Sequence, residues 1–424
     1  MQAASLSVRD QNVIWHPYTQ MKTAPAPVGI VRGQGALLFD ENDNSYIVAT
    51  SSWWVNIHGH AHPPIAQQLA AQAMQLEHCI FAGFTHPPAV NLAERLLRVL
   101  PSNQRRVFYS DNGSTAVEVA LKMALQYWDN KGYRKRKILA FKNAYHGDTF
   151  GAMSVSGRSV FTRVFDDLLF EVHFLEVPTA ENISQIINTI AALQPEEIAA
   201  FIFEPLLQGS GGMIMYDAAI FEQLLQYCSS RDILLIADEV MTGFGRTGKN
   251  FAMEYMQTQP DMICLSKGLT GGTMALGVTT TTAAIYEAFL SDDKLKTLFH
   301  GHSFTANPLA CTAALASLDL FTDPACADNR KRIHEKHLAF LQQLQQLPGI
   351  KNPRLLGTVL AFEIITTNAD GYTNILADEL HRFFRAKRIM LRPLGNTLYI
   401  LPPYCITNEQ LNQVYECILE RENR

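Results

Sequence analysis

The runs LLIADE at residues 234–239 and MICLSKG at residues 262–268 decide the fold of this 424-residue chain. Each is an apolar stretch that ends in charged residues, Asp238 with Glu239 in the first and Lys267 in the second. Strands that are apolar throughout are typical of a parallel sheet covered on both faces. Lys267 follows Asp238 by 29 residues, which is enough for a crossover to another strand of the same sheet.

Further strands and helices alternate around these two runs. Apolar stretches predict strands over residues 106–110, 138–141, 198–203, 233–237 and 262–265. Helical spacing of apolar residues predicts helices over residues 114–128 and 221–228. The sequence therefore predicts an α/β fold with a mostly parallel sheet that has helices on both faces.

The last quarter of the chain has a different pattern, typical of a smaller α/β domain. It predicts two helices and two strands, over residues 325–347, 360–365, 378–387 and 398–401. The length of the chain also favours one large and one smaller domain. We expect an N-terminal segment at residues 1–54 that packs with the small domain, a large domain at 55–320 and the small domain at 321–424.

Composition limits the classes of partner. The net charge of −5 and the sequence pI of about 6.2 argue against nucleic acid, which favours basic surfaces. Seven cysteines, none spaced C-x-x-C, indicate reduced thiols. We see no apolar N-terminal leader and no run of the roughly 18 apolar residues that a membrane span needs. These features predict a soluble, cytoplasmic protein that has neither nucleic acid nor a membrane as its partner.

Three segments carry candidate chemistry. At Asp111–Thr115, Gly113 permits close backbone approach and Ser114 offers a hydroxyl at a helix start, which suits a phosphate; a simple helix cap is the alternative. Asp238 at a strand end can pair with a cationic ring nitrogen, or can cap the next turn together with Glu239. Lys267, held in a dry pocket, can form a Schiff base, whereas a surface lysine is the alternative.

Taken together, the three segments supply what pyridoxal phosphate needs from a protein: a phosphate cradle, an acid for the ring nitrogen and a Schiff-base lysine. Two other patterns are weaker. The run GFGRTGK at 243–249 fits G-x-G-x-x-G, but no acid closes a strand about 20 residues later as a dinucleotide site requires. His58, His60 and His62 alternate without a fitting carboxylate or cysteine, so we expect a turn and no metal site.

The chain resembles the class III pyridoxal-phosphate aminotransferases over nearly its whole length. The resemblance is carried by residues 237–249, 260–263, 266–272, 15–19, 51–54, 123–128, 145–154 and 391–393. It implies the fold of the fold-type I enzymes, a large domain with a mostly parallel sheet plus a smaller C-terminal α/β domain. It also implies a homodimer with active sites shared between the subunits.

The resemblance also assigns roles to residues. It implies that Gly113 and Ser114 hold the phosphate, that Asp238 pairs with the ring nitrogen and that Lys267 bonds to the cofactor. The remaining implied roles are a ring-stacking, substrate-contacting Tyr145, a substrate pocket of Tyr18, Trp53 and Trp54, a carboxylate-binding Arg392, and Gly301, His302 and Ser303 from the partner subunit, the last two near the phosphate. Some members have Gly-Pro-Thr where this chain has residues 301–303.

Within the family, the chain is most similar to the branch that converts 8-amino-7-oxononanoate to 7,8-diaminononanoate in biotin biosynthesis. The segments at 15–19, 51–54, 123–128, 145–154 and 391–393 carry this similarity. S-adenosylmethionine is the usual amino donor there, and lysine serves some relatives. Three other functions remain open on the sequence: an aminotransferase for ω-amino acids or diamines, an aminomutase, and a protein that binds the cofactor without turnover.

Overall fold

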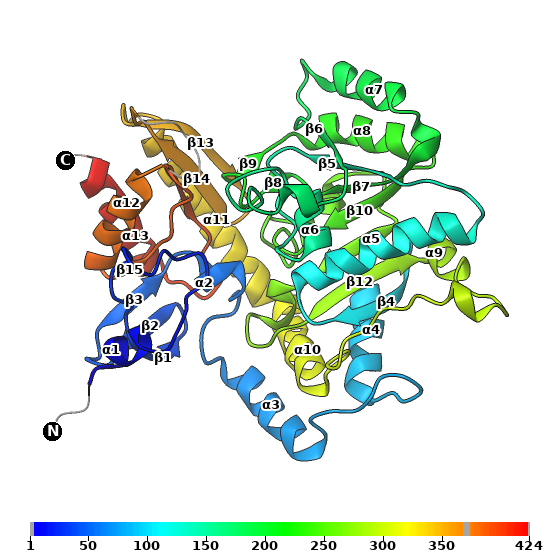
Figure 1. The fold of residues 1–424 in the computed structure, drawn as a ribbon. Helices are drawn as coiled ribbons and strands as arrows, with labels where there is room; N and C mark the ends of the chain where they lie inside the picture. Colours follow the sequence, from blue (N-terminus) through cyan, green and yellow to red (C-terminus); the bar gives the residue numbers. More distant parts are fainter. Residues whose placement is uncertain (1–3, 368–373, 423–424) are drawn as a thin grey trace.

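The computed structural model describes residues 4–367 and 374–422 and contains a large sheet flanked by helices, with a smaller layered unit beside it (Figure 1). The large sheet has seven strands in the order β4, β12, β11, β10, β7, β5 and β6. Their bounds are Gln104–Ser110, Gly277–Thr282, Met262–Leu265, Leu234–Asp238, Ile198–Phe203, Lys137–Phe141 and His173–Leu175. Only β12 runs against its neighbours, so the mostly parallel sheet predicted from the sequence is confirmed.

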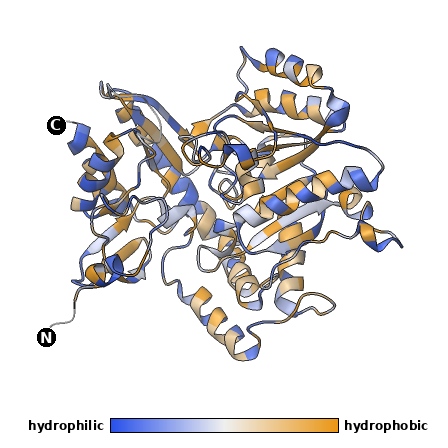
Figure 2. Cartoon of the chain, viewed as in Figure 1, coloured by the Kyte–Doolittle hydropathy of each residue, from blue (hydrophilic) through white to orange (hydrophobic). Residues whose placement is uncertain are grey.

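Alternate residues of these strands face two separate cores. Ile138 and Ala140 of β5 pack with α5 (Gly113–Asn130), α6 (Phe150–Val155) and α9 (Ala283–Glu287). Leu139 and Phe141 face the opposite core, to which helices of the large unit contribute, among them α4 (Pro87–Val99), α7 (Ile183–Ala192), α8 (Ala218–Ser230) and α10 (Pro308–Thr322). Figure 2 shows hydrophobic residues concentrated in central strands such as β7 and β10, while both colours alternate along the flanking helices. The central strands read as continuous apolar runs because both faces are covered.

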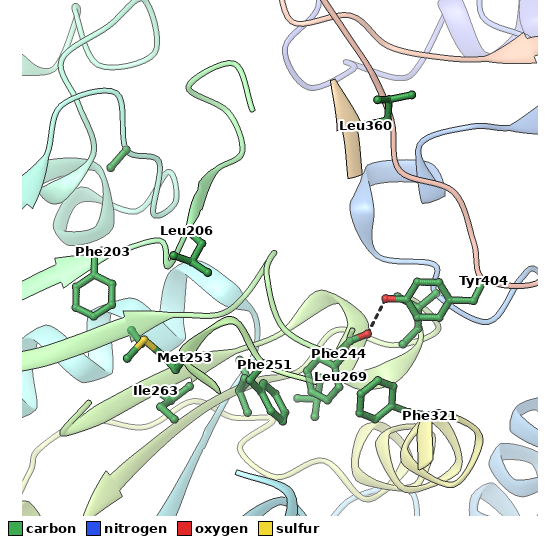
Figure 3. Packing of buried hydrophobic residues seen from close by; sticks show 14 of the residues in the cluster. Phe203, Leu206, Phe244, Phe251, Met253, Ile263, Leu269, Phe321, Leu360 and Tyr404 are labelled. Atoms are coloured by element: carbon green, nitrogen blue, oxygen red, sulfur yellow. Dashed lines mark hydrogen bonds between the residues drawn. The ribbon is translucent and has the colours of Figure 1, made fainter. Parts of the chain in front are cut away.

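Aromatic rings are prominent in the hydrophobic core that joins the large sheet to the smaller unit (Figure 3). Phe244 makes edge-on contacts with Phe251 and Phe321 at ring-centre distances of 5.4 and 5.8 Å. The buried hydroxyl of Tyr404 donates a hydrogen bond to the Phe244 carbonyl at 2.6 Å, so its burial leaves no polar group unpaired. These contacts join residues that lie up to 160 positions apart.

The C-terminal unit is built on a three-stranded antiparallel sheet. Its strands are β13 (Ile350–Leu356), β14 (Val359–Ile364) and β16 (Thr397–Ile400). Three helices belong to this part of the chain, α11 (Pro324–Leu344), α12 (Leu376–Ala386) and α13 (Asn408–Glu422). The predicted helix 325–347 ends three residues early at Leu344. The domain boundary at residue 320 stays a prediction; α10 ends at Thr322 and α11 begins at Pro324.

The N-terminal segment forms a small sheet with a strand from the C-terminal unit. Strands β1 (Ile30–Gln34), β2 (Leu37–Asp40) and β3 (Ser45–Val48) form antiparallel neighbours, and β3 pairs in parallel with β15 (Ile389–Met390). The other short elements are α1 (Leu6–Gln11), α2 (Ser51–Trp54), α3 (Pro63–Gln75), β8 (Leu207–Gln208) and β9 (Ile214–Met215). Over the described ranges 4–367 and 374–422, no helix combines the length and the apolar character that crossing a bilayer requires.

Candidate active site

The start of helix α5 opens into a cavity of about 500 Å³, lined by residues of both units. Asn112 caps the helix: its side chain accepts from the Thr115 amide at 3.0 Å and the Thr115 hydroxyl accepts from the Asn112 amide at 2.9 Å. The capping role that the sequence left open for the 111–115 segment therefore falls to Asn112. Gly113 and Ser114 line the cavity, where the helix start presents its first amides to an anion.

Two glycines give this corner its close packing. A Cβ on Gly113 would lie 2.9 Å from Cγ1 of Val240, and a Cβ on Gly147 would collide with the Ser114 hydroxyl. Gly147 has φ of +135°, which side-chain-bearing residues rarely adopt. The Ser114 hydroxyl also accepts from the Asp148 amide at 3.3 Å. The position of Ser114 therefore depends on Gly147.

Asp238 lies at the carboxyl end of β10 and is held by two donors. Its Oδ1 accepts from the Val240 amide at 3.0 Å, and its Oδ2 is 2.7 Å from Nδ1 of His146. Both side chains are buried. Within the described ranges, His146 Nε2 is buried and has no hydrogen-bond partner, although His146 lines the cavity. The sequence did not indicate a role for His146, although it directly follows the predicted site residue Tyr145.

Lys267 follows β11, the strand next to β10 in the sheet, where Cys264 pairs in register with Asp238. The lysine has φ of +44° and begins a short 3-10 turn, Lys267–Thr270. Burial lowers the pKa of its amine, while the negative charges of Asp238 and Glu204 raise it. Its Nζ lies 4.9 Å from the centre of the Trp54 ring and lines the cavity. The sequence-based alternative, a solvated surface lysine, is wrong.

A pair of buried side chains supports this turn from behind. The Ser317 hydroxyl on α10 donates to the Gly268 carbonyl at 3.2 Å and lies 3.1 Å from Nε2 of His58. Burial lowers the pKa of His58 to about 3, so its ring is neutral at pH 7. Gly271 closes the turn at φ of +63°, where a Cβ would lie 3.0 Å from the His58 ring.

Glu204 is a second buried acid of the cavity that sequence reasoning did not find. Its carboxylate accepts from the amides of Tyr145 at 3.0 Å and Gly209 at 2.9 Å. Burial and the neighbouring Asp238 raise its pKa to about 7, and His146 opposes that rise. Glu204 therefore fixes the backbone of the Tyr145 loop beside Asp238.

Aromatic residues form one wall of the cavity. Tyr18 and Trp53 lie with ring centres 5.4 Å apart, and Arg392 is stacked on Trp53 at 4.7 Å. The Trp54 ring nitrogen donates to the Tyr399 hydroxyl at 3.0 Å. Ser51, Ser52 and Trp54 have φ of 50°, 59° and 65°, a strained turn that its surroundings hold in place.

Tyr145 reaches the same cavity from the large unit. Its hydroxyl donates to Asp148 at 3.0 Å and lies 3.1 Å from the Tyr18 hydroxyl, which also donates to Asp148. Burial raises the pKa of Tyr145 well above its ordinary value, so the phenol stays protonated. Nine of the sequence-predicted residues thus line one cavity: Tyr18, Trp53, Trp54, Gly113, Ser114, Tyr145, Asp238, Lys267 and Arg392.

Gly301, His302 and Ser303 do not line this cavity of their own chain. Gly301 and Ser303 are exposed, and His302 Nδ1 lies 3.9 Å from Asp111. Their predicted contribution to the site of a partner subunit remains a prediction.

The 243–249 run has a structural use. Arg246 is fully buried and donates to the carbonyls of Pro402 at 2.9 Å and Trp54 at 3.3 Å. This segment therefore braces the aromatic wall from inside the protein, and its glycine pattern does not form an open loop around a ligand.

The residues present fit pyridoxal phosphate. The start of α5 suits a phosphate. Gly113 and Gly147 have no side chain in this tightly packed corner, so the backbone amides and the Ser114 hydroxyl can approach a phosphate closely. A buried carboxylate lies at a strand end, and the buried Nε2 of the histidine beside it has no hydrogen-bond partner among the described residues. A desolvated lysine amine opens into the same space. The phosphate cradle, the acid for the ring nitrogen and the lysine that the sequence predicted therefore lie around one cavity.

The sequence also matches a known family. The profile described as "Aminotransferase class-III" matches residues 18–420, nearly the whole chain. This chain belongs to the class III aminotransferases, and it is a pyridoxal-phosphate-dependent transferase.

Similar proteins cover almost the full length. The adenosylmethionine-8-amino-7-oxononanoate aminotransferase of Synechococcus elongatus is 48% identical over 416 residues, which are 96% of this chain and 97% of that protein. The protein of the same name from Geobacter sulfurreducens is 39% identical, over 95% of this chain and 94% of its own. The crystal structure of the Methanocaldococcus jannaschii protein of that name superposes with a TM-score of 0.93 at 36% identity and covers 98% of each chain.

The fold is shared with enzymes of other specificity. An ω-transaminase from Pseudomonas jessenii in complex with pyridoxamine phosphate superposes with a TM-score of 0.92 at 26% identity, covering 99% of this chain and 98% of that one. The fold alone therefore does not determine the substrate, which depends on the side chains of the site.

Proposed function

We propose that the protein transfers an amino group to 8-amino-7-oxononanoate, giving the 7,8-diaminononanoate of biotin biosynthesis, with S-adenosylmethionine as the amino donor. The observation that carries the proposal is the cavity in which Lys267 and Asp238 meet the Tyr18–Trp53–Arg392 wall. One part of it suits amino-group chemistry, and the other suits an alkyl chain that ends in a carboxylate. The reaction printed in the names of the full-length relatives supports the same substrate.

When it is bound, the cofactor supplies an electron sink for the carbon that carries the substrate amino group. Lys267 would hold the cofactor and then take and return the proton at that carbon, because burial lowers the pKa of its amine and so favours the neutral form. Asp238, fixed by His146 and the Val240 amide, would keep the ring nitrogen in its charged form. Gly113 and Ser114 would hold the phosphate.

The substrate wall has two chemical tasks. Arg392 would bind the terminal carboxylate of the oxo acid through its planar fork of donors. Tyr18, Trp53 and Trp54 would pack against its alkyl chain and, in the other half of the reaction, against the donor. Tyr145 would lie against the cofactor ring, with its backbone fixed by Glu204.

The working form that we propose is a cytoplasmic homodimer. In it, Gly301 would complete the substrate site, and His302 and Ser303 the phosphate site, of the partner subunit. The exposure of Gly301 and Ser303 in the single chain supports this arrangement, because neither is committed to the core.

The test follows the absorbance of the bound cofactor, with one substrate added at a time. S-adenosylmethionine alone should convert the cofactor to its amine form, and 8-amino-7-oxononanoate should then restore the starting spectrum. If lysine alone converts it, the reaction stands but the donor is wrong. If neither donor works and an ω-amino acid or diamine does, the biotin-pathway proposal is wrong and only the family assignment stands.

A further inference from the structure

A second chamber of about 440 Å³ adjoins the catalytic cavity. The two spaces share five lining residues and are separated by the side chains of Tyr145 and Phe161, whose ring centres lie 6.3 Å apart. The shared residues are Tyr145, Gly147, Phe161, Ser210 and Leu394. The second chamber therefore begins where the wall of the catalytic cavity ends, at Tyr145 and Phe161.

The chamber is assembled from segments far apart in the sequence. The loop after α6 forms one wall, the β8–β9 hairpin a second, and residues 394–397 of the C-terminal unit a third. Arg354 fastens the hairpin to that unit. Its guanidinium donates to the carbonyls of Met213 at 2.8 Å and Gly212 at 2.5 Å, and it pairs with Glu363 at 3.1 Å. The shape of the chamber is therefore fixed before a substrate arrives.

The charged side chains that line the chamber are already engaged. Arg158 donates to the carbonyls of Ser154 and Ser156 at 3.0 and 3.1 Å. Glu363 pairs with Arg354, and Asp148 accepts from two tyrosine hydroxyls. The rest of the lining is neutral and mixes hydroxyl groups with apolar side chains. Such a lining suits an uncharged, flat, partly polar group, because the guanidinium of Arg158 already donates to backbone carbonyls and lies 3.7 Å from Asp166.

We infer that this chamber binds the nucleoside end of the amino donor. The inference rests on the proposed function, in which both substrates present an amino or keto group at Lys267. The acceptor ends in a carboxylate, whose partner is Arg392 in the catalytic cavity. A donor as small as lysine would leave the chamber empty, whereas a nucleoside fits its size class and its neutral lining. The sulfonium of adenosylmethionine would then lie beside Tyr145 and Phe161, whose ring faces attract cations.

The chamber therefore separates the two half-reactions, and a side chain that fills it should affect only the donor. Ser159 and Ile214 line the chamber from different walls, and neither lines the catalytic cavity. Ser159→Trp retains the hydrogen bond from the residue 159 amide to the Thr162 hydroxyl but removes the one that the Ser159 hydroxyl accepts from the Phe161 amide at 3.3 Å. Ile214→Trp leaves both bonds in place, so the two variants must agree. Val164→Trp is the matched control, because Val164 lies on the same connecting segment, is 78% exposed and lines neither space.

The experiment uses cofactor-loaded enzyme and measures each half-reaction separately by cofactor absorbance under single-turnover conditions. Ser159→Trp and Ile214→Trp should lower the second-order rate constant for S-adenosylmethionine by at least about tenfold. The rate constant for 8-amino-7-oxononanoate, added to the amine form, should change by less than about twofold, and Val164→Trp should change neither. Equal losses with both substrates would overturn the inference, as would unchanged donor rates.

A second measurement needs no variant. Adenosine alone, which has no amino group to transfer at Lys267, should compete with S-adenosylmethionine on the wild-type enzyme and should not slow the acceptor half-reaction. Absence of competition, or equal inhibition of both half-reactions, would contradict the chamber. If the wild-type enzyme takes its amino group from lysine and not from adenosylmethionine, the donor assignment fails and the inference fails with it. If adenosylmethionine reacts normally but adenosine does not compete, only the chamber is wrong.

Discussion

Replacing Ser317 with alanine tests how the turn that carries Lys267 is supported. The Ser317 hydroxyl has one hydrogen, and the Gly268 carbonyl 3.2 Å away can only accept, so that hydrogen is used there. His58 must therefore donate from Nε2 to the Ser317 oxygen across 3.1 Å. This protonation fits a neutral ring, because burial lowers the His58 pKa to about 3.

The cost of Ser317→Ala can be worked from these contacts. The Gly268 carbonyl keeps a second donor, the Gly271 amide at 3.0 Å, so it is not left unpaired. The His58 N–H loses its partner in a buried site, and an unsatisfied buried donor costs about 1–3 kcal/mol. We therefore expect the free energy of unfolding to fall by roughly 2 kcal/mol.

The assay is urea unfolding at pH 7, compared with Ser229→Ala on the exposed face of α8, which should change stability by less than about 0.5 kcal/mol. His58→Leu combined with Ser317→Ala removes both polar partners and should cost less than the sum of the single changes. A loss below about 0.5 kcal/mol for Ser317→Ala, or strict additivity in the double variant, would refute the hydrogen-bond assignment.

Three further changes test other parts of the site and the fold. Asp238→Asn keeps the shape of the side chain but removes its charge. We expect kcat to fall at least about 100-fold, equivalent to about 3 kcal/mol, with little change in melting temperature. A kcat within about threefold of wild type would contradict the role of the carboxylate. Gly147→Ala should displace Ser114 and weaken pyridoxal phosphate binding at least about tenfold in equilibrium dialysis, whereas unchanged affinity would mean that the cradle tolerates a Cβ. Burial lowers the pKa of His337 from 6.5 to about 3. Between these two pH values the unfolded chain binds a proton at His337 and the folded chain does not. The free energy of unfolding is therefore highest above pH 6.5 and falls as the pH falls toward 3. His337→Phe should therefore flatten the pH dependence of urea unfolding in that range by up to about 1.4 kcal/mol per pH unit, and an identical slope in the variant would count against this titration.

The sheet could be predicted from the sequence where strands are buried on both faces. β7 and β11 have the predicted bounds, because a short, continuous apolar run fits a strand that is covered on both faces and is too short for a typical helix. β12 was not predicted, since its sequence GVTTTT lacks that signal. Its buried threonines are tolerated because Thr279 donates to the Ala116 carbonyl at 2.7 Å and Thr280 to the Gln104 side chain at 2.7 Å.

The cavity could be predicted in part for a similar reason. Asp238 and Lys267 are informative because each ends an apolar strand, where ligands of such sheets bind. His146 and Glu204 carry no such local signal. His146 acquires its role only through contact with a residue 92 positions away, and Glu204 only through amides at positions 145 and 209. Contacts of that range are set by the tertiary fold.

The second chamber lies beyond local patterns altogether. Its walls come from the loop after α6, the β8–β9 hairpin and the C-terminal unit. Its shape depends on the bonds from Arg354 to the carbonyls of Met213 and Gly212, which precede it by 141 and 142 positions. A sequence pattern identifies residues that act through their neighbours in the chain. It cannot identify a space whose walls meet only after folding.

The most direct test of the whole account is to identify the residue to which the cofactor is attached. The cofactor-loaded enzyme is reduced with borohydride, digested and analysed by mass spectrometry, beside a Lys267→Ala variant treated in the same way. We expect the pyridoxyl mass on Lys267 alone in the wild type, no specific label in the variant, and no amino transfer by the variant. A label on another lysine, or full turnover without Lys267, would contradict the account.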